Sequence, residues 1–233
     1  MKGIGTFIDV GAIILGGSLG TLVSKTLPKR ITQSVINGLG LISLMIGVRM
    51  TMQTHNELIA MVGLLVGFVI GSFVKLSEKI EILKRVVHNR LGVKNTNEAF
   101  QGFIMMSLVS CVGPVIIVGT IRDSLFGDIH LLLFKTIGDL FFSFSLAATF
   151  GIGVLISAPL VLLIQGGLTL LAGKLYFLLS ETVVSELTAV GGLLVIAIGL
   201  DLIEVKKLRV IDMLPALVVT PVIVVILKGI GIV

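Results

Sequence analysis

Four polar residues lie inside stretches of sequence that are otherwise apolar. Asp9 and Asn37 lie in the N-terminal part of the chain, Asp139 lies in "KTIGDLFFSFSL", and Gln165 lies in "LIQGGLTLL". Carboxylate and amide oxygens suit a hard cation, and a single carboxylate in an apolar setting also suits proton coupling. An ionisable residue inside a membrane span is costly and marks a functional site by default. These four residues are therefore candidate ligands of an ion or substrate.

Paired glycines form a second feature. Gly166 and Gly167 directly follow Gln165, and Gly16 and Gly17 occupy a similar apolar stretch near the N-terminus. Each glycine costs a helix about 1 kcal/mol relative to alanine. We predict that both pairs interrupt a helix near the middle of the membrane, where free carbonyls and helix ends would hold an ion or substrate.

A third interruption is predicted at Pro114 in "SCVGPVII". Proline lacks a backbone donor, so the carbonyl four residues earlier, that of Ser110, is left free. Hydroxyl groups accompany these candidates at Ser18, Thr21, Ser107, Ser110, Ser143, Ser145, Thr149 and Ser157.

Each polar residue also has a structural interpretation. Asp9 could lie at the outer membrane interface. Asp139 could pair with Lys135, four residues earlier on the same helix face. Gln165 could hold two helices together by hydrogen bonding. The sequence leaves these alternatives open.

The composition indicates that lipid is the solvent of most of the chain. Of the 233 residues, 55% are hydrophobic and only 13% are charged, and the mean hydropathy is +1.15. A soluble domain would be about one quarter charged. The single cysteine excludes an internal disulfide, and the absence of CxxC and HExxH motifs argues against a transition-metal centre. Since no nucleophile–base pair is visible, we expect no enzymatic activity and no cofactor other than Na⁺ or H⁺ as a transported or coupling ion.

Stretches of about 20 apolar residues predict an all-helical membrane protein. One integral domain over 1–233 is expected. Only "FGIG" separates the fifth and sixth spans, so seven helices with a broken central helix is the alternative. The eight candidate spans are 4–24, 33–51, 57–75, 99–121, 130–149, 152–173, 186–204 and 212–231.

Basic residues predict the orientation of these spans. Lysine and arginine concentrate in alternate connections, the first, third and seventh, which places those connections in the cytoplasm. Both termini then lie on the outer side of the bacterial inner membrane. The charges lie in short loops, so a lipid bilayer rather than nucleic acid is the expected partner. The first span, interrupted by Asp9, is expected to be an uncleaved helix rather than a signal peptide.

The third connection contains a distinct segment. In "SEKIEILKRVVHNRL" (77–91), apolar residues recur at three- and four-residue spacing with basic residues between them. This pattern predicts an amphipathic helix on the cytoplasmic membrane face, within a linker at 76–97. A solvated linker helix is the alternative.

Two parts of the chain resemble each other. "ILGGSLGTLVSK" (14–25) resembles "LIQGGLTLLAGK" (163–174), and "GLGLISLMIGV" (38–48) resembles "VGGLLVIAIGL" (190–200). In the second pairing Gly40 matches Gly192 and Gly47 matches Gly199. Helices 1–3 (4–75) therefore appear again as helices 6–8 (152–231), with the central helices (98–150) between them. With eight spans the two copies would have opposite orientation, which is typical of secondary transporters.

Several segments resemble the YqgA-like family of uncharacterised bacterial integral membrane proteins. They are "SCVGPVIIVGTIRDSLFGD" (110–128), "GIGVLISAPLVLLIQGG" (151–167), "ELTAVGGLLVIAIGLDLI" (186–203) and "MLPAL" (213–217). The resemblance covers essentially the whole chain. It implies a polytopic membrane protein, and some members are tagged as sodium channels or pumps. One departure is the order Gly138–Asp139, because the aspartate precedes the glycine in the family pattern.

These observations predict an ion-coupled transporter or a cation channel. An exporter of a small organic solute and a structural or assembly protein of the membrane are the alternatives. The glycine content also leaves a homo-oligomer open.

Overall fold

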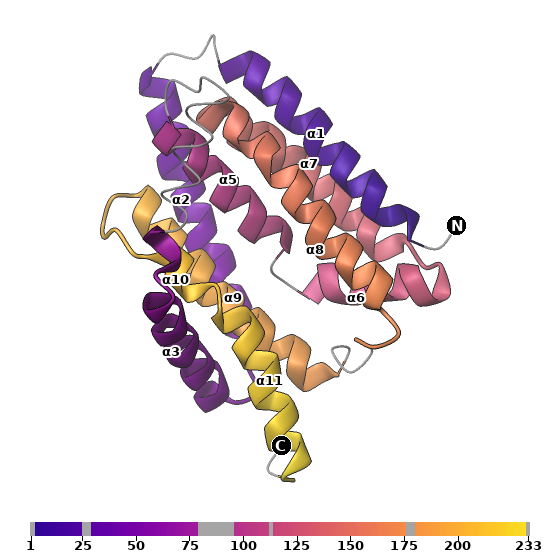
Figure 1. Cartoon of the computed structure of the whole chain (residues 1–233). Helices are drawn as coiled ribbons and strands as arrows, with labels where there is room; N and C mark the ends of the chain where they lie inside the picture. Colours follow the sequence, from indigo (N-terminus) through magenta and orange to yellow (C-terminus); the bar gives the residue numbers. More distant parts are fainter. Residues whose placement is uncertain (1–2, 25–28, 79–95, 112–113, 176–179, 232–233) are drawn as a thin grey trace. The chain divides into compact units, whose positions relative to one another are not determined.

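The structure is a computed structural model that describes residues 3–24, 29–78, 96–111, 114–175 and 180–231 (Figure 1). Throughout these ranges the regular secondary structure is helical. The chain divides into two compact units. The first unit comprises Met1–Val35 and Val87–Phe177, and the second comprises Ile36–Val86 and Leu178–Val233.

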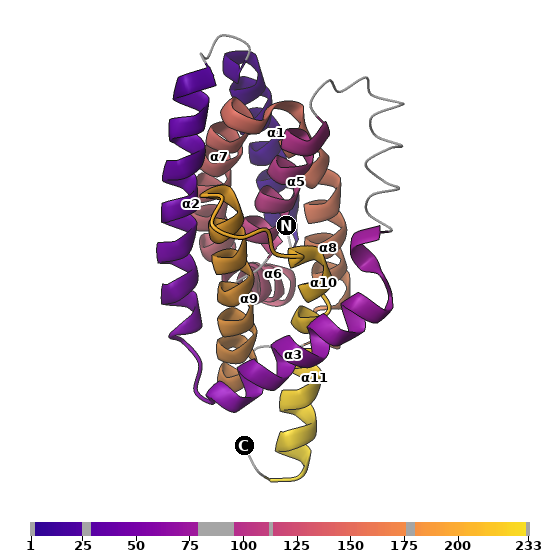
Figure 2. The same cartoon turned by 90° about the vertical axis from the view of Figure 1, so that its left-hand side faces the viewer.

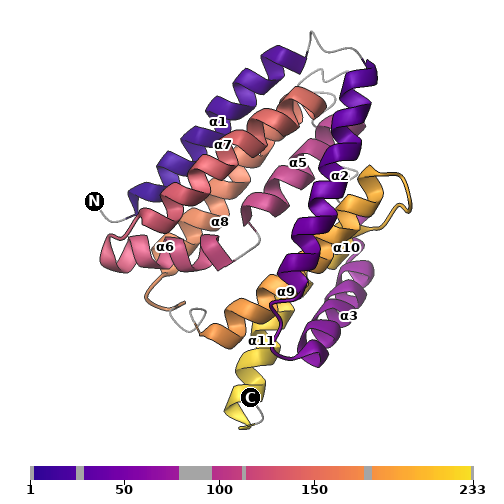
Figure 3. The ribbon, with the colours of Figure 1, turned by 180° about the vertical axis from the view of Figure 1, so that it is seen from behind.

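The first unit is organised around two long parallel helices, α1 and α7. They lie side by side along their length, and α8 runs antiparallel to them (Figures 1 and 3). Gly151, with a φ of 71°, ends α7 and allows the chain to reverse. The helices of this unit are α1 (Ile4–Ser24), α5 (Thr96–Cys111), α6 (Pro114–Phe126), α7 (His130–Phe150), the 3₁₀ helix η1 (Gly151–Ile156) and α8 (Ser157–Leu171).

Small residues allow α1 to approach α7 closely. A Cβ atom added at Gly16 would collide with the backbone carbonyl of Leu140, and one added at Gly20 would collide with that of Phe144. Because lipid provides no hydrophobic force between helices, such close packing is a main source of helix association in a membrane.

The second unit pairs its helices in the same way. α2 runs antiparallel to α9 and α3 runs antiparallel to α11, with glycines at the crossings (Figure 2). Its described apolar core contains Ile59, Val183 and Val224. The helices are α2 (Lys29–Thr51, which starts in the first unit), α3 (Glu57–Phe73), α9 (Glu181–Leu202), α10 (Val210–Met213) and α11 (Ala216–Gly229).

Length and apolar composition identify this chain as a helical membrane protein. Within the described ranges, five helical stretches are long and apolar enough to cross a bilayer, and the bent pair formed by α5 and α6 raises the number to six. Large apolar side chains such as Phe7, Phe73 and Leu170 are mostly exposed, as is expected for lipid-facing positions. The five stretches are Ile4–Ser24, Gln33–Thr51, His130–Leu171, Glu181–Leu202 and Val210–Gly229.

The predicted helix breaks at the glycine pairs are wrong. Gly16 and Gly17 lie within continuous α1, and Gly166 and Gly167 lie within continuous α8. The physical reason at Gly16 is close packing rather than unwinding. The predicted interruption at Pro114 agrees with the structure, in which α5 ends at Cys111 and α6 begins at Pro114. A further discontinuity, which was not predicted, occurs at Gly151.

The predicted amphipathic helix at 77–91 lies almost entirely outside the described residues. Only Ser77 and Glu78 of this segment are described, and both are helical.

Candidate functional site

A cluster of charged side chains is buried inside the first unit. The ammonium of Lys135 donates hydrogen bonds to Asp9 Oδ2 at 2.5 Å, to Asp139 Oδ2 at 2.6 Å and to Ser110 Oγ at 2.9 Å. The Ser110 hydroxyl in turn donates to Asp139 Oδ2 at 2.6 Å. The exposed fractions of Asp9, Asp139 and Lys135 are 0%, 4% and 9%. The cluster is thus a closed polar network among apolar helices.

Three helices bring this charge cluster together. Lys135 and Asp139 lie one turn apart on α7, so their side chains share a face. The parallel packing of α1 on α7 places Asp9 beside Lys135. α5 runs antiparallel to α7 and places Ser110 beside Asp139. The three donors of the Lys135 ammonium are then all used.

Asp9 retains one carboxylate oxygen without a hydrogen bond. Its Oδ1 is buried and has no partner in the part of the chain that the structure describes. A buried acceptor without a partner costs free energy, and such groups in native structures call for an explanation by a bound species or a functional role.

Gln165 presents the same situation on α8. Its side chain is fully buried, and neither Oε1 nor Nε2 has a hydrogen-bond partner among the described residues. One turn along α8, the Thr169 hydroxyl lies 3.1 Å from the Thr6 hydroxyl of α1. Since α1 and α8 are antiparallel, the turn of α8 that contains Gln165 lies level with the turn of α1 that contains Asp9.

Further polar atoms without partners accumulate in the first unit. Among the described side chains, buried polar atoms that lack a hydrogen bond occur on six residues, and five of these are in the first unit. The exception is Ser180. The five are Asp9, Ser107, Thr120, Thr136 and Gln165. The interior of the first unit therefore contains more buried polar atoms than the described hydrogen bonds of this unit satisfy.

The other predicted site residues lie apart from the charge cluster. Asn37 is exposed on α2 and belongs to the second unit. Gly16 and Gly17 pack against Leu140 and Leu155, whereas no atom of the described residues lies within 4 Å of a Cβ added at Gly166 or Gly167. Pro114 is the first residue of α6, and Ser110 lies in the last turn of α5.

Sequence reasoning found Asp9, Asp139 and Ser110 but missed their connection through Lys135. The spacing of Lys135 and Asp139 predicts only their mutual contact. Asp123 was also missed. Its buried carboxylate accepts hydrogen bonds from the backbone N–H groups of Gly3 (3.2 Å) and Gly5 (2.9 Å) at the start of α1. The helix dipole there favours a negative charge.

The second unit contains a buried carboxylate of a different kind. Glu186 is fully buried. Its Oε1 accepts from the backbone N–H groups of His55 (2.8 Å) and Asn56 (2.9 Å), and its Oε2 accepts from the Thr54 hydroxyl (2.7 Å). Its role is to fix the α2–α3 connection rather than to cap α9, which already begins at Glu181.

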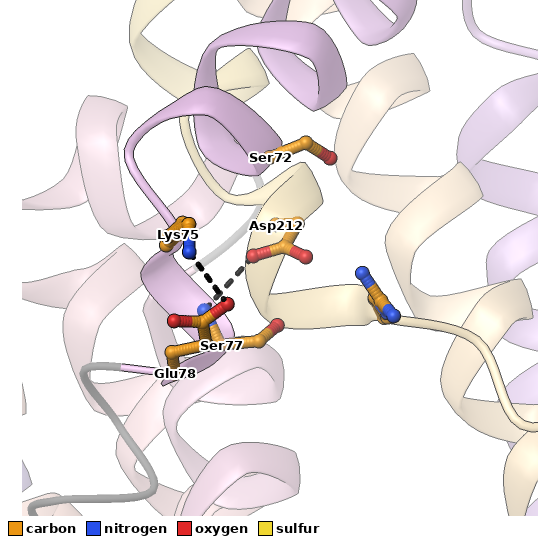
Figure 4. A pocket seen from close by; sticks show the side chains of 6 residues that line it. Ser72, Lys75, Ser77, Glu78 and Asp212 are labelled. Atoms are coloured by element: carbon orange, nitrogen blue, oxygen red, sulfur yellow. Dashed lines mark hydrogen bonds and ion pairs between the residues drawn. The ribbon is translucent and has the colours of Figure 1, made fainter.

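A shallow pocket of about 280 Å³ lies in the second unit where α3 ends and α10 begins (Figure 4). Asp212 Oδ1 accepts from the Ser77 backbone N–H at 2.9 Å, and Lys75 pairs with Glu78 at 3.4 Å across its rim. Because that ion pair is largely exposed, the pocket has the character of a polar surface rather than of a buried site. It is lined by Ser72, Lys75, Ser77, Glu78, Arg209 and Asp212.

Known proteins resemble the chain over nearly its full length. Residues 4–225 match the family described as "Protein of unknown function (DUF554)". The chain is 33% identical to "Uncharacterized protein YqgA" of Escherichia coli (strain K12) over 219 residues, which cover 92% of this chain and 93% of that protein. It is 26% identical to "Uncharacterized membrane protein YdfK" of Bacillus subtilis (strain 168) over 231 residues, which cover 97% and 98%. No solved structure matches.

Proposed function

The chain belongs to the DUF554 family, and we propose that it is an ion-coupled transporter or a cation channel of the bacterial inner membrane, with both termini outside. The observation that carries this proposal is the buried cluster of Asp9, Lys135 and Asp139. Three ionised groups inside an apolar helix bundle cost several kcal/mol of desolvation each. In membrane proteins such groups characteristically line ion or proton pathways.

We further propose that the chain crosses the membrane eight times. His130–Leu171 contains 42 residues, about twice the length that one bilayer crossing requires. Gly151 divides it into α7 and α8, which run antiparallel and therefore count as two spans. α3, the α5–α6 pair and the α10–α11 pair supply the remaining crossings beside α1, α2 and α9.

Contacts between α2 and α9 support an inverted repeat. In the sequence, Gly40 matches Gly192 and Gly47 matches Gly199. In the structure, an added Cβ at Gly47 would lie 2.8 Å from the Gly192 carbonyl oxygen, and one at Gly40 would lie 3.2 Å from the Gly199 carbonyl oxygen. Gly47 thus contacts the residue that matches Gly40, and Gly40 contacts the residue that matches Gly47. This reciprocity is what a two-fold axis between equivalent helices produces, and inverted repeats are typical of transporters.

A flux assay tests the proposed function. The purified chain is reconstituted into liposomes, and Na⁺, K⁺ and H⁺ fluxes are measured for the native protein, for Asp139→Asn and for the control Asp128→Asn. Asp128 is partly exposed, pairs with Arg122 and accepts a hydrogen bond from the His130 backbone N–H, so the loss of its charge leaves the buried cluster intact. We expect flux of at least one of these ions, lost in Asp139→Asn and retained in the control.

Two results contradict the proposal. If no ion flux exceeds that of empty liposomes, the chain is not an ion transporter or channel under these conditions, and a panel of amino acids and polyamines then tests the solute exporter. If Asp139→Asn folds and retains full ion flux, the charge cluster is not the ion pathway.

A further inference from the structure

The charge cluster contains two carboxylates and only one ammonium. Lys135 neutralises one of Asp9 and Asp139, so the buried site carries one negative charge in excess when both are ionised. We propose that this site binds one monovalent positive charge, a Na⁺ ion or a proton, at Asp9 Oδ1, with Lys135 as its permanent neighbour. This inference deepens the proposed function, because it names the class and number of the ions that the site takes.

No other described charge of the first unit compensates the excess. Asp123 is held by the start of α1, and Arg122 pairs with Asp128. The Arg30 and Lys174 side chains are exposed. Glu98 lies about three turns from Ser110 along α5, and Cys111 contributes no positive charge. In the described ranges, α8 and η1 contain no ionisable side chain, and the remaining one of α7 is His130 at its first residue.

The oxygens for such a site are present. Asp9 Oδ1 on α1, Thr136 Oγ1 on α7 and Gln165 Oε1 on α8 are all buried, and each lacks a partner at hydrogen-bond distance in the described structure. The Thr136 side chain interacts with the Asp9 carboxylate. Thr136 is the neighbour of Lys135, and the Thr6–Thr169 contact places the Gln165 turn level with the Asp9 turn. Carboxylate, hydroxyl and amide oxygens are the ligands that hard cations prefer.

Electrostatics selects the valence of the bound ion. One monovalent cation makes the site neutral, whereas a divalent cation would leave it with a net positive charge inside the membrane. Charge in a medium of low dielectric constant is strongly disfavoured unless it is balanced. Lys135 therefore limits the site to a single bound positive charge. Without Lys135, two positive charges or one divalent cation would make the site neutral.

Thermal unfolding of the purified full chain in detergent tests the inference without any flux. The unfolding temperature is measured in choline chloride at constant ionic strength, with added NaCl, KCl, MgCl₂ or CaCl₂, between pH 5 and pH 9. We expect NaCl to raise the unfolding temperature at high pH and to lose this effect at low pH, where a proton supplies the charge. MgCl₂ and CaCl₂ are expected to have no such effect.

Three variants identify the site. Asp9→Asn removes the excess charge, so both the sodium effect and the pH dependence should disappear. Gln165→Leu removes an oxygen but keeps the charge, so sodium binding should weaken on the order of tenfold while the pH dependence persists. Lys135→Gln should become sensitive to MgCl₂ or CaCl₂. Asp128→Asn is the control and should behave as the native protein does.

A pH dependence that Asp9→Asn abolishes, without any sodium effect, supports the inference with the proton as the ion. Three results overturn the inference. The unfolding temperature could respond to neither sodium nor pH, it could respond equally in Asp9→Asn, or it could respond to divalent ions in the native chain. Since these readings need no transport, absent flux with intact sodium binding would contradict the proposed function alone.

Discussion

The buried carboxylates of the second unit and those of the charge cluster in the first unit are held in opposite ways. In the second unit, Glu186 and Asp212 accept hydrogen bonds from backbone N–H groups of nearby connections. In the first unit, Asp9 and Asp139 share a single lysine, and Asp9 Oδ1 remains without a partner among the described residues. In the second unit the carboxylates satisfy backbone N–H groups of a fixed connection. In the first unit one carboxylate oxygen remains able to accept a further hydrogen bond or ion.

This difference separates structural from functional burial. A carboxylate saturated by backbone donors has little capacity to change its state, because any change breaks several hydrogen bonds at once. A carboxylate that shares one lysine with a second carboxylate and keeps an oxygen without a hydrogen bond can exchange a proton or a cation at lower cost. We therefore propose a structural role for Glu186 and a functional role for the cluster around Lys135.

The largest expected effect is that of Lys135→Met. Removing the ammonium leaves Asp9 and Asp139 unpaired in an apolar interior, and breaking a buried pair in this way costs about 3–5 kcal/mol of the free energy of unfolding. Denaturant titration in detergent measures this loss. The triple variant that adds Asp9→Asn and Asp139→Asn should recover most of it, since no charge of the cluster remains. A triple variant as unstable as the single one would show that Lys135 acts through packing instead.

Glu186→Ala should have the next largest effect. It removes the acceptor of three hydrogen bonds, leaves the His55 N–H unpaired and leaves the Asn56 N–H with the Thr54 hydroxyl alone, which corresponds to about 2–3 kcal/mol. The same titration measures the loss. Ion flux per folded molecule should not change, because the carboxylate holds a connection and binds no ion. Lost flux in a folded Glu186→Ala protein would remove the distinction between the two units.

The helical character of the apolar stretches could be predicted from the sequence, whereas the structure supports five or six of the eight predicted spans by length and composition. The site could be predicted only in part. Helix α1 begins and ends where its apolar stretch predicts, at Ile4 and Ser24, because span length is a local property. The contact of Lys135 with Asp139 is also local. The link to Asp9 depends on the packing of α1 along α7, between residues 126 positions apart, and no local pattern contains it.

The glycine pairs show why local rules mislead in a membrane. A low helix propensity predicts a break at Gly16–Gly17, but lipid does not compete for backbone hydrogen bonds and a helix persists there. The glycines instead allow close contact with a neighbouring backbone. The sequence could not predict that the Gln165 side chain lacks hydrogen-bond partners among the described residues, because this depends on which side chains surround one turn of α8.

A smaller effect is expected from Gly192→Ala at the α2–α9 crossing. Its added Cβ would lie 2.6 Å from the carbonyl oxygen of Gly47, so the helices must separate, at a cost of about 1–3 kcal/mol for an overpacked contact. Gly38→Ala on α2 is the matched control, because no atom lies within 4 Å of its added Cβ. Equal unfolding midpoints for the two variants would contradict the close crossing that supports the inverted repeat.

The smallest effect is expected from Gly166→Ala and Gly167→Ala, and its sign is informative. Both added Cβ atoms meet open space within a continuous helix, so each alanine should raise the free energy of unfolding by up to about 1 kcal/mol. Gly16→Ala, which meets the Leu140 carbonyl, should lower it instead. If the α8 variants gain stability and keep full ion flux, the glycines serve neither packing nor gating. If they gain stability but lose flux, α8 must bend at this point during transport, next to Gln165, and its straight form is one of two working states.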